Sequence, residues 1–186
     1  MALLVTACTD GDKPAPPILL NFHVIEEGRA YRSPQLSGEA LAWVIDRYGI
    51  RSVVNLRGTN PDQKWYREEA AVCREKGVVL IDHPFNSQQL PAPELLAGLL
   101  ETLRSAERPM LIHCQGGADR TGAAAALYRM IVLNQSRQQA MAELSADYWH
   151  SRAKAPCMDR LIELFEPTEA WLEQYAATYQ QISCTP

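Results

Sequence analysis

From residue 21 onward, short apolar runs alternate with longer stretches in which apolar residues recur every three or four positions. The apolar runs predict strands at residues 51–56, 78–81 and 110–113, and 78–81 has the composition of a buried strand. Two short strands or a hairpin are predicted within residues 22–33. The amphipathic stretches predict helices, at residues 37–48, 63–76, 94–106, 123–133, 136–148 and 156–179, the last with a candidate break at Pro167.

Strands that alternate with helices predict an α/β fold, in which a central, mostly parallel sheet is flanked by helices. In such sheets ligands bind beyond the carboxyl ends of the strands. The segment that follows residues 110–113 is therefore the first place to look for a functional site.

That segment reads His-Cys-Gln-Gly-Gly-Ala-Asp-Arg-Thr-Gly, from His113 to Gly122, and an alanine-rich helical stretch follows it. A tight loop between a strand and a helix points backbone N–H groups and the positive end of a helix dipole at one spot, which suits a phosphate group. Cys114 lies at the start of this loop and Arg120 at its end. Both the dipole and the guanidinium favour a thiolate at Cys114, so the loop predicts covalent phosphoryl transfer.

The residue types in the loop fit distinct roles in that chemistry. Cys114 is the predicted nucleophile, and Arg120 offers a planar fork to two phosphate oxygens. The hydroxyl of Thr121 is placed to hydrogen bond the Cys114 sulfur, and His113 to fix the loop rather than to act as a base. Gly116 and Gly117 permit unusual dihedral angles that turn amides inward. The predicted phosphate-binding residues are Gln115, Gly116, Gly117, Ala118, Asp119 and Arg120.

The pattern His-Cys-x5-Arg-Thr-Gly resembles the signature of the cysteine-based protein tyrosine phosphatase superfamily. Residues 21–148 are similar to its compact, atypical dual-specificity branch in bacteria, and Ala-Tyr-Arg-Ser at 30–33 and Gly-Ile-Arg-Ser-Val-Val-Asn-Leu-Arg at 49–57 resemble two early strands of that branch. The resemblance implies a tyrosine-phosphatase-like fold, a phosphocysteine intermediate, and neither a metal nor another cofactor.

The general acid is the point at which the sequence departs from the resembled family. Relatives usually supply an aspartate from a loop upstream of the cysteine, but residues 84–90 contain no carboxylate. Asp119, inside the loop and next to Arg120, is the preferred candidate, because some relatives with Gly-x-Asp-Arg use that aspartate. Asp82, which follows the strand at 78–81, is the alternative.

A few residues outside the loop are candidate contributors to the site. Arg57 follows a predicted strand and could contact substrate, whereas an exposed, solvated arginine is the more common situation. Arg32 could order the site or form a surface ion pair. The sequence gives His23, His83 and His150 no partners, and they are interpreted as structural or surface residues.

The first twenty residues suggest two segments ahead of the domain. Residues 1–8 resemble the end of a bacterial lipoprotein signal, with Cys8 as the lipidated residue, and residues 9–20 form a proline-rich tether. The catalytic domain is then 21–186. On this interpretation a lipid anchor holds the protein on the periplasmic side of the cell envelope; otherwise the sequence predicts a cytoplasmic protein.

Composition narrows the function further. A chain of 186 residues fits one domain, and its net charge of -4 gives no basic footprint for nucleic acid. Cys73 is interpreted as a small buried residue, while Cys157 and Cys184 could pair in an oxidising compartment. The expected partner is a phosphorylated protein or a small phosphate ester, and the expected state is a monomer.

Four functions compete for this site. A protein tyrosine or dual-specificity phosphatase is favoured. An inositol phosphate or phosphoinositide phosphatase is the alternative, weakened because Gln115, Gly116 and Ala118 leave the loop poor in positive charge. A sulfurtransferase fits the motif poorly. An inactive module that only binds phosphorylated ligands is disfavoured by the intact Cys114, Asp119 and Arg120.

Overall fold

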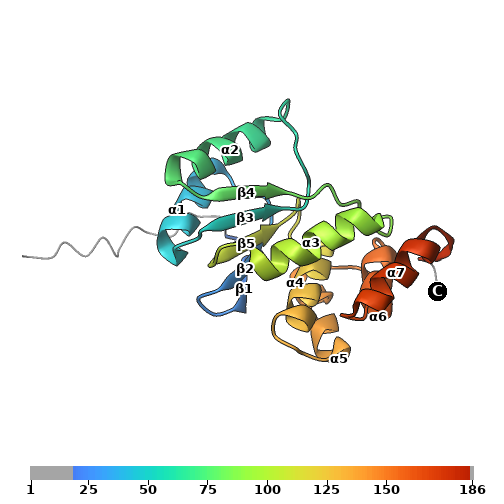
Figure 1. Ribbon diagram of the computed structural model, residues 1–186. Coiled ribbons are helices and arrows are strands. Elements are labelled where there is room, and N and C mark those ends of the chain that lie inside the picture. The colour runs from blue at the N-terminus through green and yellow to red at the C-terminus, as the bar shows by residue number, and fades with distance from the viewer. Residues whose placement is uncertain (1–18, 185–186) are drawn as a thin grey trace, which may run out of the picture.

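In a computed structural model, which describes residues 19–184, a five-stranded sheet lies at the centre of the fold with strand order β1-β2-β5-β3-β4 (Figure 1). The strands are β1 (His23–Glu26), β2 (Ala30–Ser33), β3 (Ser52–Asn55), β4 (Val79–Asp82) and β5 (Met110–His113). Only the hairpin of β1 and β2 is antiparallel, and the other pairs are parallel. The mostly parallel α/β fold predicted from the alternating pattern is therefore confirmed.

Helices cover both faces of the sheet, so that each face has its own apolar core. Helices α1 (Gly38–Tyr48) and α2 (Lys64–Lys76) pack on one face. On the other face lie α3 (Pro93–Ser105) and α4 (Asp119–Ile131). Helix α6 (Pro156–Leu164) and the short α5 (Arg137–Ala140) pack on α4, and α7 (Glu169–Thr178) packs on α3, farther from the sheet (Figure 1). Burial on both faces explains why the strands read as continuous apolar runs.

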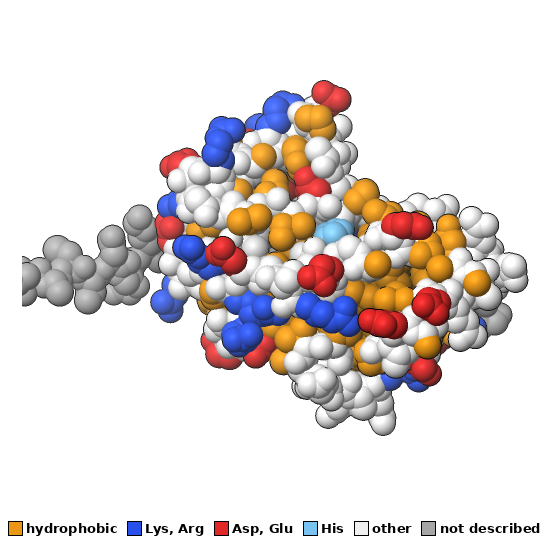
Figure 2. All heavy atoms as spheres, in the orientation of Figure 1, with side chains coloured by type: hydrophobic (Ala, Val, Ile, Leu, Met, Phe, Trp, Pro, Cys, Tyr) orange, Lys and Arg blue, Asp and Glu red, His pale blue; other side chains and the backbone are white. Residues whose placement is uncertain are grey.

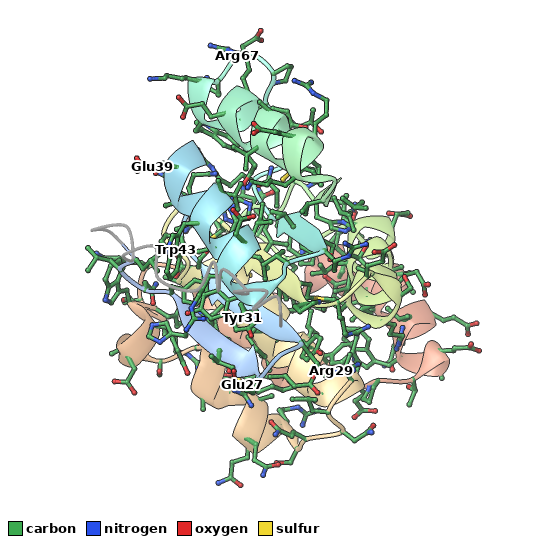
Figure 3. The ribbon with its side chains drawn as sticks, turned by 90° about the vertical axis from the view of Figure 1, so that its left-hand side faces the viewer. Glu27, Arg29, Tyr31, Glu39, Trp43 and Arg67 are labelled. Atoms are coloured by element: carbon green, nitrogen blue, oxygen red, sulfur yellow. A yellow bond between two sulfur atoms is a disulfide. The ribbon has the colours of Figure 1, made fainter. Side chains whose placement is uncertain are left out.

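Local signals set the ends of the helix α1. The Ser37 side chain accepts a hydrogen bond from the Ala40 N–H at the start, and Gly49 ends the helix in the left-handed conformation with φ of 64°. At its end the Tyr48 ring lies 4.7 Å from that of Tyr31 in β2. Figure 3 shows Tyr31 and Trp43 on this side of the molecule, with Glu27 and Arg29 at the turn of the β1–β2 hairpin.

The position of β4 in the sheet and the first residue of α4 differ from the prediction. The strand β4 forms an edge of the sheet, with Val79 50 % exposed, so it is not the buried strand that its composition predicts. Asp82 is its last residue rather than the residue after it. Helix α4 begins at Asp119 instead of residue 123, because the first helical turn is built from loop residues whose composition is not helical.

The C-terminal third is more broken than periodicity predicts. Residues 136–148 form α5 and two 3-10 turns, Met141–Glu143 and Ala146–Tyr148, instead of one helix. Leu144 leaves the helical conformation between them; Glu143 reaches Arg32 in β2, and His150 contacts α4 and α6. The predicted long helix at 156–179 is interrupted near Pro167, because proline cannot continue a helix, and yields α6 and α7.

Two cysteines are paired, and the surface carries charges of both signs. Cys157 and Cys184 form a disulfide, and Cys73 is buried with its thiol pKa raised to about 12, mainly by desolvation. Acidic and basic side chains lie side by side on the face shown in Figure 2. Within residues 19–184, none of the helices combines the length and the apolar character needed to cross a membrane. Cys8 and residues 1–18 lie outside the described residues.

Candidate active site

The loop of interest, residues 114–118, leaves the sheet at its centre. Its strand β5 lies between β2 and β3, and both neighbours are in register with it up to His113, opposite Ser33 and Asn55. The loop therefore emerges at the carboxyl edge of parallel strands and leads directly into α4. Cys114 follows His113 and is 3 % exposed.

The carbonyl groups of residues 115–118 accept hydrogen bonds from residues in other parts of the chain. Gln115 O accepts from the backbone N–H of Gln35 at 3.1 Å, and Gly116 O accepts from Asn21 Nδ2 at 2.9 Å. Arg32 Nη2 donates to Gly117 O at 2.8 Å and to Ala118 O at 3.4 Å.

Because a trans peptide places its N–H opposite its C=O, these contacts turn the N–H groups of residues 116–119 away from the surrounding elements. Within the described part of the chain, those N–H groups donate to no other group. The result is a row of unpaired donors at the start of a helix, which suits an anion.

Gly117 is required by the same packing. Its φ of +69° lies in the left-handed region, and a Cβ there would lie 2.6 Å from the backbone nitrogen of Pro34. Gly116 has no such constraint, because an added Cβ would meet nothing within 4 Å. Of the two glycines expected to shape the loop, Gly117 therefore carries the conformational requirement.

Arg32 is a buried side chain that holds the loop through hydrogen bonds to its carbonyl groups. Its side chain is fully buried and also bonds the backbone and the carboxylate of Glu143, which in turn pairs with Arg129. The guanidinium lies 4.0 Å from the centre of the Tyr148 ring. Burial lowers the pKa of Arg32, and the charge and hydrogen bond of Glu143 oppose that shift. Arg32 thus orders the site, and a surface ion pair is the wrong interpretation.

Arg120 lies in the first turn of α4 and reaches across the edge of the sheet. Its Nη1 donates to Leu56 O at 3.3 Å and to Phe85 O at 3.2 Å, so the groups after β3 and β4 hold the guanidinium in place. Its other donors bind no group among the described residues, which leaves them available to an oxyanion.

Arg57 lies beside this site. Its guanidinium stacks 3.4 Å above the Trp65 ring and donates to Gln35 Oε1, the side chain of the residue whose N–H holds the loop. Desolvation lowers the pKa of Arg57, and so does the positive charge of Arg120. A second cation therefore stands close to Arg120.

His113, the residue before Cys114, lies against a carboxylate from α2. His113 Nε2 lies 2.8 Å from Glu69 Oε1, a close polar contact without the alignment of a hydrogen bond. Gln35 Nε2 donates to the same Glu69 oxygen at 3.1 Å. These contacts surround the His113 ring, and its role in fixing the loop by hydrogen bonds stays a prediction. The Thr121 hydroxyl is buried and bonds no described group, so the expected bond to the Cys114 sulfur is not made here.

The structure separates the two candidate acids. Asp119 is the first residue of α4, directly after the loop, and its Oδ1 lies 2.7 Å from His150 Nδ1, with its side chain 33 % exposed. Asp82 is the last residue of the edge strand β4, and its oxygens accept hydrogen bonds from Asn55, Thr59 and Tyr66. Asp119 thus lies at the start of α4, next to Arg120 and directly after the loop of Cys114, whereas Asp82 ends the edge strand β4.

Sequence reasoning missed the residues that reach the loop from a distance. Asn21, Gln35, Glu143 and His150 lie far from Cys114 in the chain, and none belongs to a local motif. The His150 interpretation as an isolated residue is wrong, since it contacts both Asp119 and Asp159.

A cysteine at the start of such a cradle, an arginine at its end, and a mostly parallel sheet around them define the class of cysteine-based phosphatases. A family model described as "DSP-PTPase phosphatase fused to NAD+ Kinase" matches residues 21–158. The chain belongs to this family, within the atypical dual-specificity branch of the class.

Curated and solved relatives support the same placement. The dual specificity protein phosphatase TpbA of Pseudomonas aeruginosa is 29% identical over 116 residues, which cover 61% of this chain and 49% of TpbA. The chain thus spans about half the length of the curated relatives it matches.

Two solved structures have the same fold. The crystal structure of P. aeruginosa TpbA has a TM-score of 0.62 at 21% identity and covers 86% of this chain and 91% of its own. The core catalytic domain of the PP-IP phosphatase SIW14 from S. cerevisiae has a TM-score of 0.65 at 24% identity and covers 88% and 94%. At these identities the likeness concerns the fold.

Proposed function

We propose that this chain hydrolyses phosphate monoesters through a phosphocysteine intermediate formed on Cys114. The observation that carries the proposal is the loop itself: the carbonyls of residues 115–118 accept hydrogen bonds from Gln35, Asn21 and Arg32, while the N–H groups of residues 116–119 bond no described group. Cys114 and Arg120 bracket those donors at the start of α4. A dianionic phosphoryl group fits such a cradle, and the cradle favours a thiolate.

In the first step the Cys114 sulfur attacks phosphorus in line. The S–P bond forms as the bond from phosphorus to the leaving oxygen breaks, and that oxygen takes a proton from the general acid. The loop N–H groups and the free donors of Arg120 stabilise the charge that builds on the equatorial oxygens.

In the second step a water molecule attacks phosphorus. The new O–P bond forms as the S–P bond breaks, the proton of the water passes to the carboxylate that acted as the acid, and inorganic phosphate leaves. The thiolate of Cys114 and the protonated acid are both restored, so the cycle needs no metal and no cofactor. Among residues 19–184, no cluster of three or more His, Cys, Asp or Glu side chains is arranged to hold a metal ion.

Asp119 is the proposed acid. It begins the helix that directly follows the loop of Cys114, and one of its oxygens bonds no described group. Both oxygens of Asp82 are already acceptors in a network with Asn55, Thr59 and Tyr66, so a protonated Asp82 would have to displace one of those donors.

Phosphorylated proteins are the proposed substrates, with phosphotyrosine first. The name of TpbA as a dual specificity protein phosphatase and a TpbA variant solved in complex with pTyr support this choice. Inositol phosphates are the alternative, because SIW14 is described as a PP-IP phosphatase and Arg57 adds a cation beside the loop. A panel of phosphopeptides, inositol phosphates and phosphoinositides separates the two.

The direct test is the hydrolysis of an aryl phosphate under reducing conditions with a chelator present. Wild type is expected to turn over and Cys114→Ser to lose at least 1000-fold in rate, on the order of what the removal of a nucleophile costs. Equal rates for both proteins would reject the phosphocysteine mechanism. Binding of phosphate without any turnover by wild type would instead support the non-catalytic binding module.

We also propose a location outside the cytoplasm, on the periplasmic side of the cell envelope. The disulfide between Cys157 and Cys184 supports it, because such bonds persist in oxidising compartments. Mass spectrometry of protein from native membranes tests the lipid anchor at Cys8, and an unlipidated Cys8 would reject it.

A further inference from the structure

His150 is a buried residue that joins the catalytic loop to the C-terminal helices. Its side chain is 2 % exposed, with Nδ1 2.7 Å from Asp119 Oδ1 and Nε2 2.8 Å from Asp159 Oδ2. Asp159, on α6, is itself buried at 5 % exposure. The chain reverses at Trp149, whose φ is +65°, and the His150 N–H bonds Ser145 O, so this turn aims the imidazole at the loop.

The two contacts define the protonation of the ring. Each nitrogen faces a carboxylate oxygen, so both must carry a hydrogen for both bonds to form. Burial alone would lower the pKa of His150, but the hydrogen bonds and charges of Asp119 and Asp159 outweigh it and raise the pKa. His150 is thus a fixed donor to Asp119, and Asp159 holds the ring from behind.

The consequence concerns the two oxygens of Asp119. Oδ1 is committed as an acceptor to His150, while Oδ2 bonds no described group and its side chain is partly exposed. An acid with two equivalent free oxygens could turn its proton away from the substrate, whereas this one cannot.

We infer that His150, held by Asp159, is a positioning residue for Asp119, which leaves Oδ2 as the oxygen that exchanges the proton. This inference rests on the proposed function and on Asp119 as its acid. In the first step the Oδ2–H bond breaks as the O–H bond of the leaving group forms. In the second step an O–H bond of water breaks and Oδ2–H is restored.

The leaving group of the substrate provides the test. A residue that acts through the general acid changes kcat more for a poor leaving group than for a good one, whereas a merely structural residue changes both alike. His150→Ala is expected to lower kcat for an alkyl phosphate, a poor leaving group, by roughly tenfold or more, and kcat for p-nitrophenyl phosphate by less than about twofold. His150→Asn, whose amide can donate from near the Nδ1 position, should recover part of the loss.

A double-mutant cycle with Asp119→Asn isolates the coupling. In the Asp119→Asn background, His150→Ala should cause no further change in the ratio of the two rates. The matched control is His83→Ala, another buried histidine, which bonds Thr102 Oγ1 and should leave that ratio unchanged. Asp159→Ala, which removes the acceptor of His150 Nε2, offers a second route to the same loss if His150→Ala does not fold, which thermal melts report.

The outcomes separate this inference from the proposed function. If His150→Ala and Asp159→Ala slow both substrates equally, or have the same effect in the Asp119→Asn background as in wild type, the positioning role is wrong. If Asp119→Asn itself leaves the leaving-group dependence intact, the acid is elsewhere and the inference fails, while the phosphocysteine mechanism stands. If Cys114→Ser keeps full activity, the proposed function fails first.

Discussion

At the scale of single residues, Gly117 shows how tightly the cradle is built. Substituting alanine there places a Cβ 2.6 Å from the Pro34 nitrogen and forces a left-handed backbone. Gly117→Ala is expected to cost about 2 kcal/mol or more of unfolding free energy and most of the activity, since the loop must shift. Urea denaturation and aryl phosphate turnover measure the two effects.

Gly116→Ala is the matched control for that experiment. It adds the same methyl group one position earlier, where nothing lies within 4 Å. Its stability should stay within about 0.5 kcal/mol of wild type. A loss as large as that of Gly117→Ala would mean that the loop tolerates no added volume anywhere, and that the close approach to Pro34 is not the cause.

Arg57 leads to a second residue-scale prediction. If its free donors serve the substrate, Arg57→Gln should raise the inhibition constant of pyrophosphate by about tenfold relative to that of orthophosphate, because a charge-assisted hydrogen bond is lost. Arg67→Gln is the control, since Arg67 lies on the exposed side of α2 (Figure 3). Equal changes for both anions would place Arg57 in a purely structural role.

The residues that sequence predicts well are those whose role is local. Cys114, Gly117 and Arg120 lie together because one strand, one turn and one helix start place them there. His150 and Asn21 have no such local signal, because only the tertiary fold brings them to the loop. The residues of the motif can be predicted from the local sequence, whereas the distant residues that hold the loop cannot.

At the scale of elements, the same contrast holds. Helix α1 is predicted closely, because Ser37 and Gly49 cap it. The segment 136–148 is not, because its apolar spacing suits a helix while the buried pairing of Glu143 with Arg32 requires a bend. A buried charge must be paired, and here that pairing overrides the helix that the apolar spacing predicts.

The segment after β4 is held by the C-terminal elements. The Tyr175 hydroxyl of α7 donates to Pro91 O at 2.7 Å, and Gln88 Nε2 donates to Lys154 O at 2.7 Å. Phe85 O, in the same segment, accepts from Arg120. Helix α7 thus holds the same segment whose Phe85 carbonyl accepts from Arg120.

The disulfide that ties the end of the chain to α6 should stabilise this arrangement. Cys184→Ser opens a link between residues separated by 27 positions and is expected to lower the unfolding free energy by about 2–4 kcal/mol. Denaturation with and without reductant measures it, and reductant should have no further effect on the variant. An unchanged midpoint for reduced wild type would show that the link contributes nothing to stability.

At the scale of the whole molecule, His150 makes stability depend on pH. Its pKa is raised in the folded state above the ordinary value of 6.5, so its contribution is full below pH 6.5 and is lost as the pH rises through the folded pKa. The stability difference between wild type and His150→Asn should therefore shrink as the pH rises from 6 to 9.

That comparison must be a difference between two proteins, because other histidines act in the opposite sense. Burial lowers the pKa of His23 and of His83, so their contributions are lost as the pH falls. Both are present in the variant as well and cancel. A difference that grows with pH would contradict the imidazolium form of His150.

The contacts around the loop also set the order in which the site is completed during synthesis. Asn21, Arg32 and Gln35 leave the ribosome before the loop, but Glu143 and His150 follow it. Until they emerge, the Arg32 guanidinium has no carboxylate to accompany it into the interior, and it cannot be buried beneath the loop carbonyls. A nascent chain that already contains Cys114 therefore lacks a finished cradle, and the reactive sulfur gains its surroundings only when the domain is nearly complete.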